Sequence, residues 1–245
     1  MRRTLSPRFL ALGLAALATA GVAFAADDHG GPVVPKPYTA GATLTRSVQA
    51  GITPDKAIDI LKAGNARFAA DEPLRRALKA QVQATALGQF PFASVVGCID
   101  SRAAPELVFD QGVGDLFVAR VAGNTVNPDI LGSLEYASKV AGSRLIVVLG
   151  HTSCGAIKGA CDDVKMGNLT TLLEKFKPAV AAASTPGERN AHNHAFVDEV
   201  TELNVKQVVA RIRAESPLLK ALEDEGRIRI VGALYDTSSG KVSWF

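Results

Sequence analysis

Four continuous apolar segments that alternate with helical segments constrain the fold of this chain more than any other feature of its sequence. The apolar segments are FASVVGC (92–98), DLFVARVAG (115–123), RLIVVLGH (144–151) and IRIVGALYD (228–236). Helical patterns separate the last three, as PDILGSLEYASKVAG and NVKQVVARIRAESPLLKALEDEG. Apolar strands that alternate with helices are typical of a parallel sheet covered on both faces. We therefore predict an α/β fold with a mostly parallel central sheet flanked by helices.

Helical patterns also precede the first apolar segment. The segment TPDKAIDILKAGNARF (53–68) has a capping threonine, a proline in its first turn and one apolar face. A second helix is expected over residues 73–87. Residues 26–52 contain several Pro, Gly and Thr residues without a clear period, which indicates a linker or extended arm. We expect an N-terminal helical arm before the sheet and one domain over residues 53–245, long enough for a full core.

The first 25 residues have the pattern of a signal peptide. A basic start with Arg2, Arg3 and Arg8 is followed by an apolar middle and a small-x-small sequence ending at Ala25. We expect cleavage near Ala25, a periplasmic or secreted protein, and no membrane span after cleavage; an uncleaved membrane anchor over residues 9–25 is the alternative. Cleavage removes three arginines and no acids, so the formal net charge falls from +3 to zero. No basic patch then argues for a nucleic-acid partner.

Potential metal ligands end two of the apolar segments. Cys98 ends the first, and His151 ends the third, with Cys154 three residues later. Ligands of open parallel sheets lie outside the carboxyl ends of the strands, and two cysteines with one histidine are a known catalytic zinc set that leaves the fourth position open. A lone cysteine at a strand end is more often a small buried apolar residue, so buried thiols are the alternative. The two segments together, with Asp100 and Arg102 beside Cys98, favour a metal site.

These motifs resemble those of the β-class carbonic anhydrases. The family's zinc motif is Cys-x-Asp-x-Arg with a later His-x-x-Cys, and CIDSR followed by HTSCGAIKGA matches it. The similarity extends from about residue 53 to residue 245 and includes GNARF, GDLFVAR, SLEYA and the ending IVGALYDTSSGKVSWF. The resemblance implies one Zn²⁺ per chain on Cys98, His151 and Cys154. It also implies a catalytic pair formed by Asp100 and Arg102.

The resemblance further implies a substrate pocket. Gln89 matches a substrate-binding glutamine of the plant-like subgroup, and Phe117 and Tyr136 match its apolar wall residues. In the family this pocket lies at a dimer interface, so a homodimer or higher homo-oligomer is expected. A second subgroup has a bicarbonate regulatory site with a tryptophan three residues before the first zinc cysteine. Val95 occupies that position here, which argues against bicarbonate regulation.

The implied function is the reversible hydration of carbon dioxide to bicarbonate and a proton by zinc-bound hydroxide. Two thiolates neutralise the formal charge of Zn²⁺, so the bound water should deprotonate less readily than at a three-histidine site. An ionised Asp100 can compensate by accepting a hydrogen bond from that water, and Arg102 restrains Asp100 through a charge-assisted pair. The alternatives are a zinc hydrolase of carbon disulfide or carbonyl sulfide on the same fold, and a non-catalytic zinc-binding or scaffold protein.

Other residues with chemical potential are expected to have no part in the site. His192 and His194 are two positions apart, so on a helix they would face different directions, and solvated positions are expected for both. Cys161 lies about two helical turns after Cys154 and is expected to be a buried free thiol. The glycine spacing of RVAGNTV (120–126) differs from a dinucleotide fingerprint.

Overall fold

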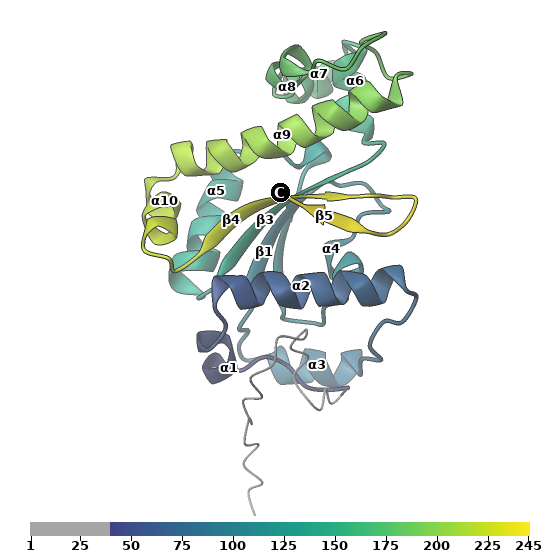
Figure 1. The fold of residues 1–245 in the computed structure, drawn as a ribbon. Coiled ribbons are helices and arrows are strands. Elements are labelled where there is room, and N and C mark those ends of the chain that lie inside the picture. The colour runs from purple at the N-terminus through teal and green to yellow at the C-terminus, as the bar shows by residue number, and fades with distance from the viewer. Residues whose placement is uncertain (1–39) are drawn as a thin grey trace, which may run out of the picture. The chain divides into compact units, whose positions relative to one another are not determined.

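The structure, a computed structural model, describes residues 40–245. The predicted signal peptide and residues 26–39 of the predicted arm lie outside this range. One five-stranded sheet in the order β2-β1-β3-β4-β5 forms the centre of the described region (Figure 1). The strands are β1 Ala93–Gly97, β2 Leu116–Arg120, β3 Leu145–His151, β4 Arg229–Tyr235 and β5 Val242–Trp244. The first four run parallel and β5 pairs antiparallel with β4, which confirms the predicted mostly parallel sheet.

Helices cover both faces of this sheet. Figure 1 shows α2 along one face and α9 along the other, with α6, α7 and α8 gathered near the first turns of α9. The helices are α1 Arg46–Ala50, α2 Pro54–Ala69, α3 Leu78–Thr85, α4 Pro105–Val108, α5 Pro128–Glu135, α6 Gly155–Cys161, α7 Gly167–Glu174, α8 Lys177–Ala182, α9 His194–Glu215 and α10 Pro217–Asp224, with a short 3₁₀ turn η1 Ala122–Asn124 and a π-helical turn η2 Tyr136–Val140. Among residues 40–245, none of the helices combines the length and the apolar character needed to cross a membrane.

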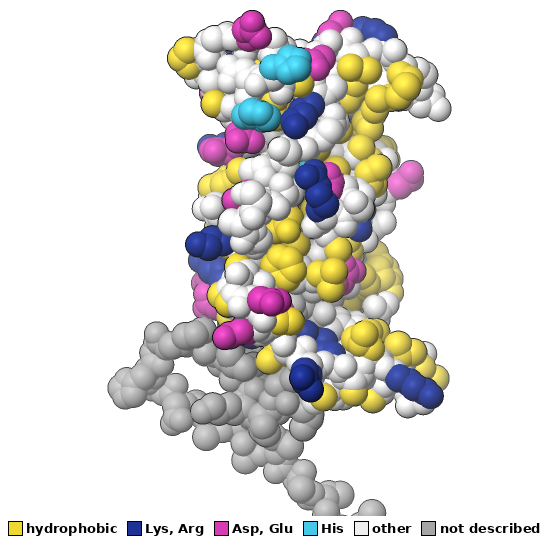
Figure 2. Space-filling model, turned by 90° about the vertical axis from the view of Figure 1, so that its right-hand side faces the viewer, with side chains coloured by type: hydrophobic (Ala, Val, Ile, Leu, Met, Phe, Trp, Pro, Cys, Tyr) yellow, Lys and Arg dark blue, Asp and Glu magenta, His cyan; other side chains and the backbone are white. Residues whose placement is uncertain are grey.

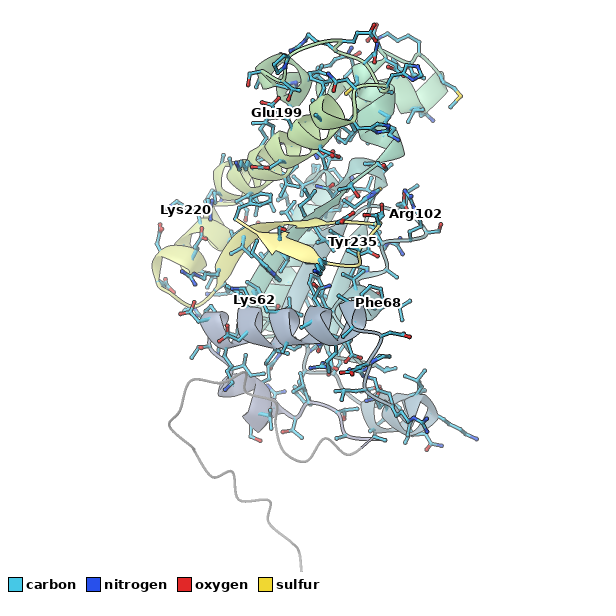
Figure 3. All side chains as sticks on the ribbon, turned by 45° about the vertical axis from the view of Figure 1, so that its right-hand side comes forward. Lys62, Phe68, Arg102, Glu199, Lys220 and Tyr235 are labelled. Carbon is cyan, nitrogen blue, oxygen red and sulfur yellow. The ribbon has the colours of Figure 1, made fainter. Side chains whose placement is uncertain are left out.

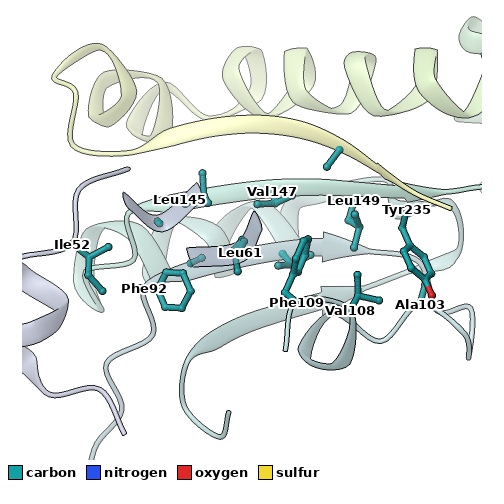
Figure 4. Packing of buried hydrophobic residues seen from close by; sticks show 14 residues of the cluster. Ile52, Leu61, Phe92, Ala103, Val108, Phe109, Leu145, Val147, Leu149 and Tyr235 are labelled. Carbon is teal, nitrogen blue, oxygen red and sulfur yellow. The ribbon is translucent and has the colours of Figure 1, made fainter. Parts of the chain in front are cut away.

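Burial on both faces explains the apolar character of β1 and β3. All seven residues of β3 are buried. Leu145, Val147 and Leu149 point into the cluster under α2, which is drawn in Figure 4. Ile146 and Val148 point the other way, into the cluster formed with α9, α5 and α10. Burying one such side chain contributes about 1.5–3 kcal/mol, so a strand between two helical layers has little room for polar residues.

The sequence GNARF ties α2 to the rest of the domain. A Cβ added at Gly64 would lie 1.8 Å from the carbonyl oxygen of Phe109, so only glycine fits there. The Asn65 amide donates to the carbonyl oxygens of Val108 at 3.0 Å and Gly240 at 2.8 Å, and its oxygen accepts the Val242 N–H at 2.8 Å. This motif therefore fixes α4 and the β4–β5 turn against α2.

The second helix is shorter than predicted. We expected it over residues 73–87, but α3 spans Leu78–Thr85 and residues 72–77 have no regular structure. The buried carboxylate of Asp110 holds this segment in a non-helical conformation. It accepts the Leu74 N–H at 3.2 Å and forms ion pairs with Arg67 at 2.6 Å and with Arg76.

Two other helical segments are interrupted. Residues 204–226 form the end of α9 and all of α10, separated at Ser216, whose hydroxyl caps α10 by accepting the Leu219 N–H at 3.2 Å. Pro217 follows, and the residue before a proline is disfavoured in helical geometry. Residues 128–142 form α5 and then η2, in which the Ala141 N–H donates to the carbonyl oxygen of Tyr136 at 3.0 Å.

The predicted linker also contains a short helix. Residues 46–50 form α1, which is capped by the Thr45 side chain.

Candidate metal centre

Two neighbouring strand ends and one helix start bring the three predicted metal ligands together. Cys98 directly follows β1, His151 is the last residue of β3, and Cys154 is the N-cap of α6. All three side chains are buried, and their ligand atoms lie within 4.8 Å of one another. The Sγ atoms of Cys98 and Cys154 are 4.0 Å apart. The parallel pairing of β1 with β3 produces this convergence, since it places both carboxyl ends at one edge of the sheet.

The three side chains shift one another's pKa values in opposite directions. The hydrogen bond from the Cys154 thiol, together with the Gly123 N–H at 3.3 Å, lowers the pKa of the Cys98 thiol against the opposing effect of burial. The same bond and burial raise the pKa of Cys154. Nε2 of His151 is buried without a hydrogen-bond partner, while Nδ1 lies 2.9 Å from the Thr152 carbonyl oxygen. A buried polar atom without a partner is costly, and a metal ion would satisfy it.

Asp100 and Arg102 form a bidentate pair beside this centre. Nε of Arg102 donates to Oδ1 at 2.9 Å and Nη2 donates to Oδ2 at 2.8 Å, and the Arg102 backbone N–H donates to Oδ1 at 3.0 Å. The hydrogen bonds from Arg102 hold the pKa of Asp100 far below its usual range. Oδ2 of Asp100 lies 3.8 Å from Nε2 of His151, so the carboxylate faces the centre. Figure 3 shows Arg102 at the edge of the domain, beyond Tyr235.

Arg120 holds the loop that carries Cys98 and Asp100. Its Nε donates to the carbonyl oxygen of Cys98 at 2.7 Å and its Nη2 donates to that of Asp100 at 2.6 Å. No role for Arg120 in this loop was predicted from the sequence. Its place at the carboxyl end of β2, the strand paired with β1, was the available signal.

The predicted pocket residues fall into two groups. The rings of Phe117 and Tyr136 meet edge to face, with centroids 6.4 Å apart, and Tyr136 is 55% exposed. Gln89 instead lines a shallow depression with Thr85, Val113 and neighbouring residues, among which none of the three metal-ligand candidates occurs. Within the described part of one chain, no recorded contact brings Gln89 to the centre. Its role in substrate binding stays a prediction.

The residues set aside in the sequence lie outside the centre. His192 and His194 are exposed, as predicted, in the turn before α9 and at its first residue. Cys161 is a free cysteine at the end of α6, and it is half-buried rather than buried. Burial raises the pKa of its thiol to about 11, which leaves it protonated near neutral pH.

Comparisons with known proteins agree with this geometry. The family model described as carbonic anhydrase matches residues 93–242. Carbonic anhydrase 2 of Mycobacterium tuberculosis is 38% identical over 187 residues, which cover 74% of this chain and 87% of the relative. The carbonic anhydrase of Mycolicibacterium smegmatis is 38% identical over 188 residues, covering 74% and 88%.

Solved structures give the same result at the level of the fold. A Coccomyxa β-carbonic anhydrase in complex with acetazolamide superimposes with a TM-score of 0.59 at 25% identity, covering 75% of this chain and 83% of that one. A β-carbonic anhydrase of Sordaria macrospora, one of two described as tetrameric, has a TM-score of 0.59 at 25% identity, covering 66% and 84%.

Proposed function

This chain belongs to the β-class carbonic anhydrase family, and from that membership we propose that it catalyses the reversible hydration of carbon dioxide to bicarbonate and a proton with one zinc ion. Cys98, His151 and Cys154 would hold the metal. The observation that carries the proposal is the buried, unpartnered Nε2 of His151, which lies among two thiols and beside an intact Asp100–Arg102 pair.

The proposed ligand set fits a catalytic zinc site. Three protein ligands leave a fourth tetrahedral position for water or substrate, whereas structural zinc sites close all four. When bound, zinc supplies the Lewis acidity that makes water a nucleophile near neutral pH. Two thiolates and one imidazole are softer ligands than magnesium or calcium prefers, which supports zinc over those ions.

In this proposal Asp100 acts on the reacting water and Arg102 restrains Asp100. Asp100 is ionised at any working pH, because Arg102 holds its pKa down, so its carboxylate can accept a hydrogen bond from that water and fix its orientation. Arg102 keeps both carboxylate oxygens engaged through two parallel hydrogen bonds. This restraint would keep Asp100 from rotating onto a bound metal ion and occupying its open position.

The test combines stopped-flow carbon dioxide hydration with elemental analysis of the purified protein. We expect one zinc per chain, and we expect Cys98→Ser to lose most of it. Cys161→Ser is the matched control, since that thiol lies outside the centre and should leave zinc content and rate unchanged. Full zinc retention in Cys98→Ser would overturn the ligand assignment. A zinc-loaded protein that hydrolyses carbon disulfide or carbonyl sulfide but does not hydrate carbon dioxide, or that is inert, would establish one of the alternatives.

We propose a homodimer or higher assembly of this chain. Gln89 lies away from the centre of its own chain, which is the arrangement expected if a partner's Gln89 completes the pocket. Figure 2 shows the edge of the domain that faces the carboxyl ends of the strands, where apolar side chains are exposed among charged ones. In the described region, exposed large apolar residues include Ile99 and Leu107, which are close to Asp100 in the sequence, and Tyr136 and Val140 on η2.

We also propose the plant-like subgroup and export from the cytoplasm. Val95, at the position of the regulatory-site tryptophan, is fully buried in the cluster under α2, which supports the absence of a bicarbonate site there. Bicarbonate titration of the hydration rate should show only product inhibition. N-terminal mass analysis of protein recovered from the periplasm or medium should find a chain that begins near Ala26.

A further inference from the structure

The hydroxyl group of Thr152 is one anchor of the loop that carries two of the three candidate ligands. Thr152 lies between His151 and Cys154, and its N–H donates to the Tyr235 carbonyl oxygen at 2.9 Å, which extends the β3–β4 ladder by one residue. Its Oγ1 accepts the Thr237 N–H at 3.0 Å. The same oxygen lies 3.1 Å from the Thr237 hydroxyl and donates to Oδ1 of Asp236 at 3.4 Å. Both the backbone and the side chain of Thr152 are therefore bound to the end of β4 and the turn that follows it.

The β4–β5 turn is itself tightly held. The Asp236 carboxylate accepts the Ser238 N–H at 2.9 Å, the Ser238 hydroxyl at 2.8 Å and the Ser239 hydroxyl at 2.6 Å. These hydrogen bonds lower the pKa of Asp236 to about 2. Asp236 is consequently an ionised acceptor at every pH where the protein would be assayed. The turn offers Thr152 a fixed set of partners.

This anchor bears directly on the candidate zinc histidine. The carbonyl oxygen of Thr152 lies 2.9 Å from Nδ1 of His151, and because a carbonyl can only accept, Nδ1 carries the hydrogen. In the neutral ring, Nε2 then carries the lone pair, and it is buried without an oxygen or nitrogen hydrogen-bond partner. Ser153, the next residue, has φ of 56°, a left-handed conformation that non-glycine residues adopt only when their surroundings impose it. Removing the Thr152 hydroxyl would therefore remove one restraint on a strained loop.

We propose that Thr152 is a positioning residue whose hydroxyl, held by Asp236 and Thr237, directs its own carbonyl oxygen onto Nδ1 of His151 and so presents Nε2 to the metal. The inference rests on the proposed zinc site and adds to it a residue that contacts neither metal nor substrate. Partners of a ligating histidine fix its tautomer and ring orientation, and their loss typically weakens metal binding by roughly 10–100-fold.

The test measures zinc affinity by chelator competition on the purified full chain. Thr152→Val keeps the side-chain shape and removes the hydroxyl, so we expect zinc to bind roughly 10–100-fold more weakly. Thr152→Ser restores the hydroxyl and should restore wild-type affinity. Thr170→Val is the matched control, because the Thr170 hydroxyl also binds a backbone N–H, that of Met166 at 2.8 Å, far along the chain from the centre. Its zinc affinity should equal that of the wild type.

A second measurement does not depend on any variant. Nitrogen-15 NMR of the metal-free wild type should show the hydrogen of neutral His151 on Nδ1. A hydrogen on Nε2, wild-type zinc affinity in Thr152→Val, or equal losses in the valine and serine variants would each overturn the inference. A wild-type protein that binds no zinc would instead overturn the zinc site itself, so the wild-type titration separates the two failures.

Discussion

At the scale of single residues, the centre depends on groups that hold other groups in place. Arg102 holds the Asp100 side chain, and Arg120 holds the backbone on either side of Ile99 through the carbonyl oxygens of Cys98 and Asp100. Each of these contacts is a charge-assisted hydrogen bond, which is stronger and more directional than a neutral one. The centre formed by Cys98, His151 and Cys154 therefore lies beside a carboxylate, that of Asp100, which has little freedom to move.

The first prediction concerns the carboxylate. Asp100→Asn should keep zinc at one per chain and lower kcat/KM for carbon dioxide hydration by roughly 100-fold, because an amide accepts a hydrogen bond from water less strongly than a carboxylate and releases Arg102. Stopped-flow hydration with zinc analysis of the same sample measures both quantities. A fully active, zinc-loaded Asp100→Asn would show that the carboxylate has no such role.

The guanidinium provides the matching comparison. Arg102→Ala should also lower the rate with zinc retained, by freeing Asp100 to approach the metal. Arg102→Lys should restore little, since an ammonium group cannot make the two parallel hydrogen bonds at 2.9 and 2.8 Å. If the lysine variant had wild-type activity, positive charge alone would be sufficient and the bidentate geometry would be unimportant.

At the scale of secondary-structure elements, close backbone contacts hold the helices to the sheet. The second prediction is that Gly64→Ala on α2 destabilises the protein by about 3 kcal/mol or more, because the new methyl group would overlap the Phe109 carbonyl group and force the helix away from it. Gly132→Ala on α5 is the control, since nothing lies within 4 Å of an added Cβ there. That variant should be neutral or up to about 1 kcal/mol more stable. Urea unfolding of both variants measures the difference.

A third prediction concerns the contact between α9 and the segment after α8. The carboxylate of Glu199 accepts hydrogen bonds from the N–H and hydroxyl groups of both Ser184 and Thr185. These bonds lower its pKa to about 2, below an ordinary value of about 4.3. A lowered pKa contributes stability that is fully present above the ordinary value and is lost as the pH falls through the folded one. Glu199→Gln should therefore lower Tm most near neutral pH and progressively less below about pH 4.

Glu202→Gln is the control for that experiment. Glu202 lies on the same helix in an exposed pair with Lys206 at 2.6 Å, and such pairs contribute little. Its Tm should remain near the wild-type value at every pH. A Glu199→Gln deficit that did not change between neutral and acidic pH would mean that charge is unimportant in this contact.

The elements also show which features the sequence could predict. The four parallel strands and the convergence of Cys98, His151 and Cys154 followed from apolar runs and from the rule that parallel strands end at one edge. The shortened second helix could not be predicted in this way. It depends on Asp110, a residue far along the chain, which accepts the Leu74 N–H and forms an ion pair with Arg76. The anchor of Thr152 on Asp236 likewise joins residues 84 positions apart. Contacts of this kind have no local signature in a single sequence.

At the scale of the whole molecule, α3 exposes apolar side chains and buries a polar one. Leu78 and Val82 are 56% and 55% exposed, one turn apart on the same side of the helix. Gln81 is buried, donating to the Ala42 carbonyl oxygen at 3.0 Å and accepting the Val113 N–H at 3.2 Å. Leu87, just after the helix, is fully exposed. Exposed apolar side chains of this size, grouped on α3 and just after it, mark an interaction surface.

The last prediction is that a second copy of this chain covers that surface and that activity depends on it. Light scattering of the wild type should give a dimer or larger assembly. Val82→Glu places a charge among these apolar side chains, so it should shift the assembly towards monomer and lower kcat/KM, because the partner's Gln89 would no longer complete the pocket. Leu218→Glu on α10 is the control, since its side chain is 37% exposed on an element far along the chain from α3, and the assembly should persist. A wild-type monomer with full hydration activity would contradict the proposal. A Val82→Glu protein that stays assembled and active would place the subunit contact away from α3.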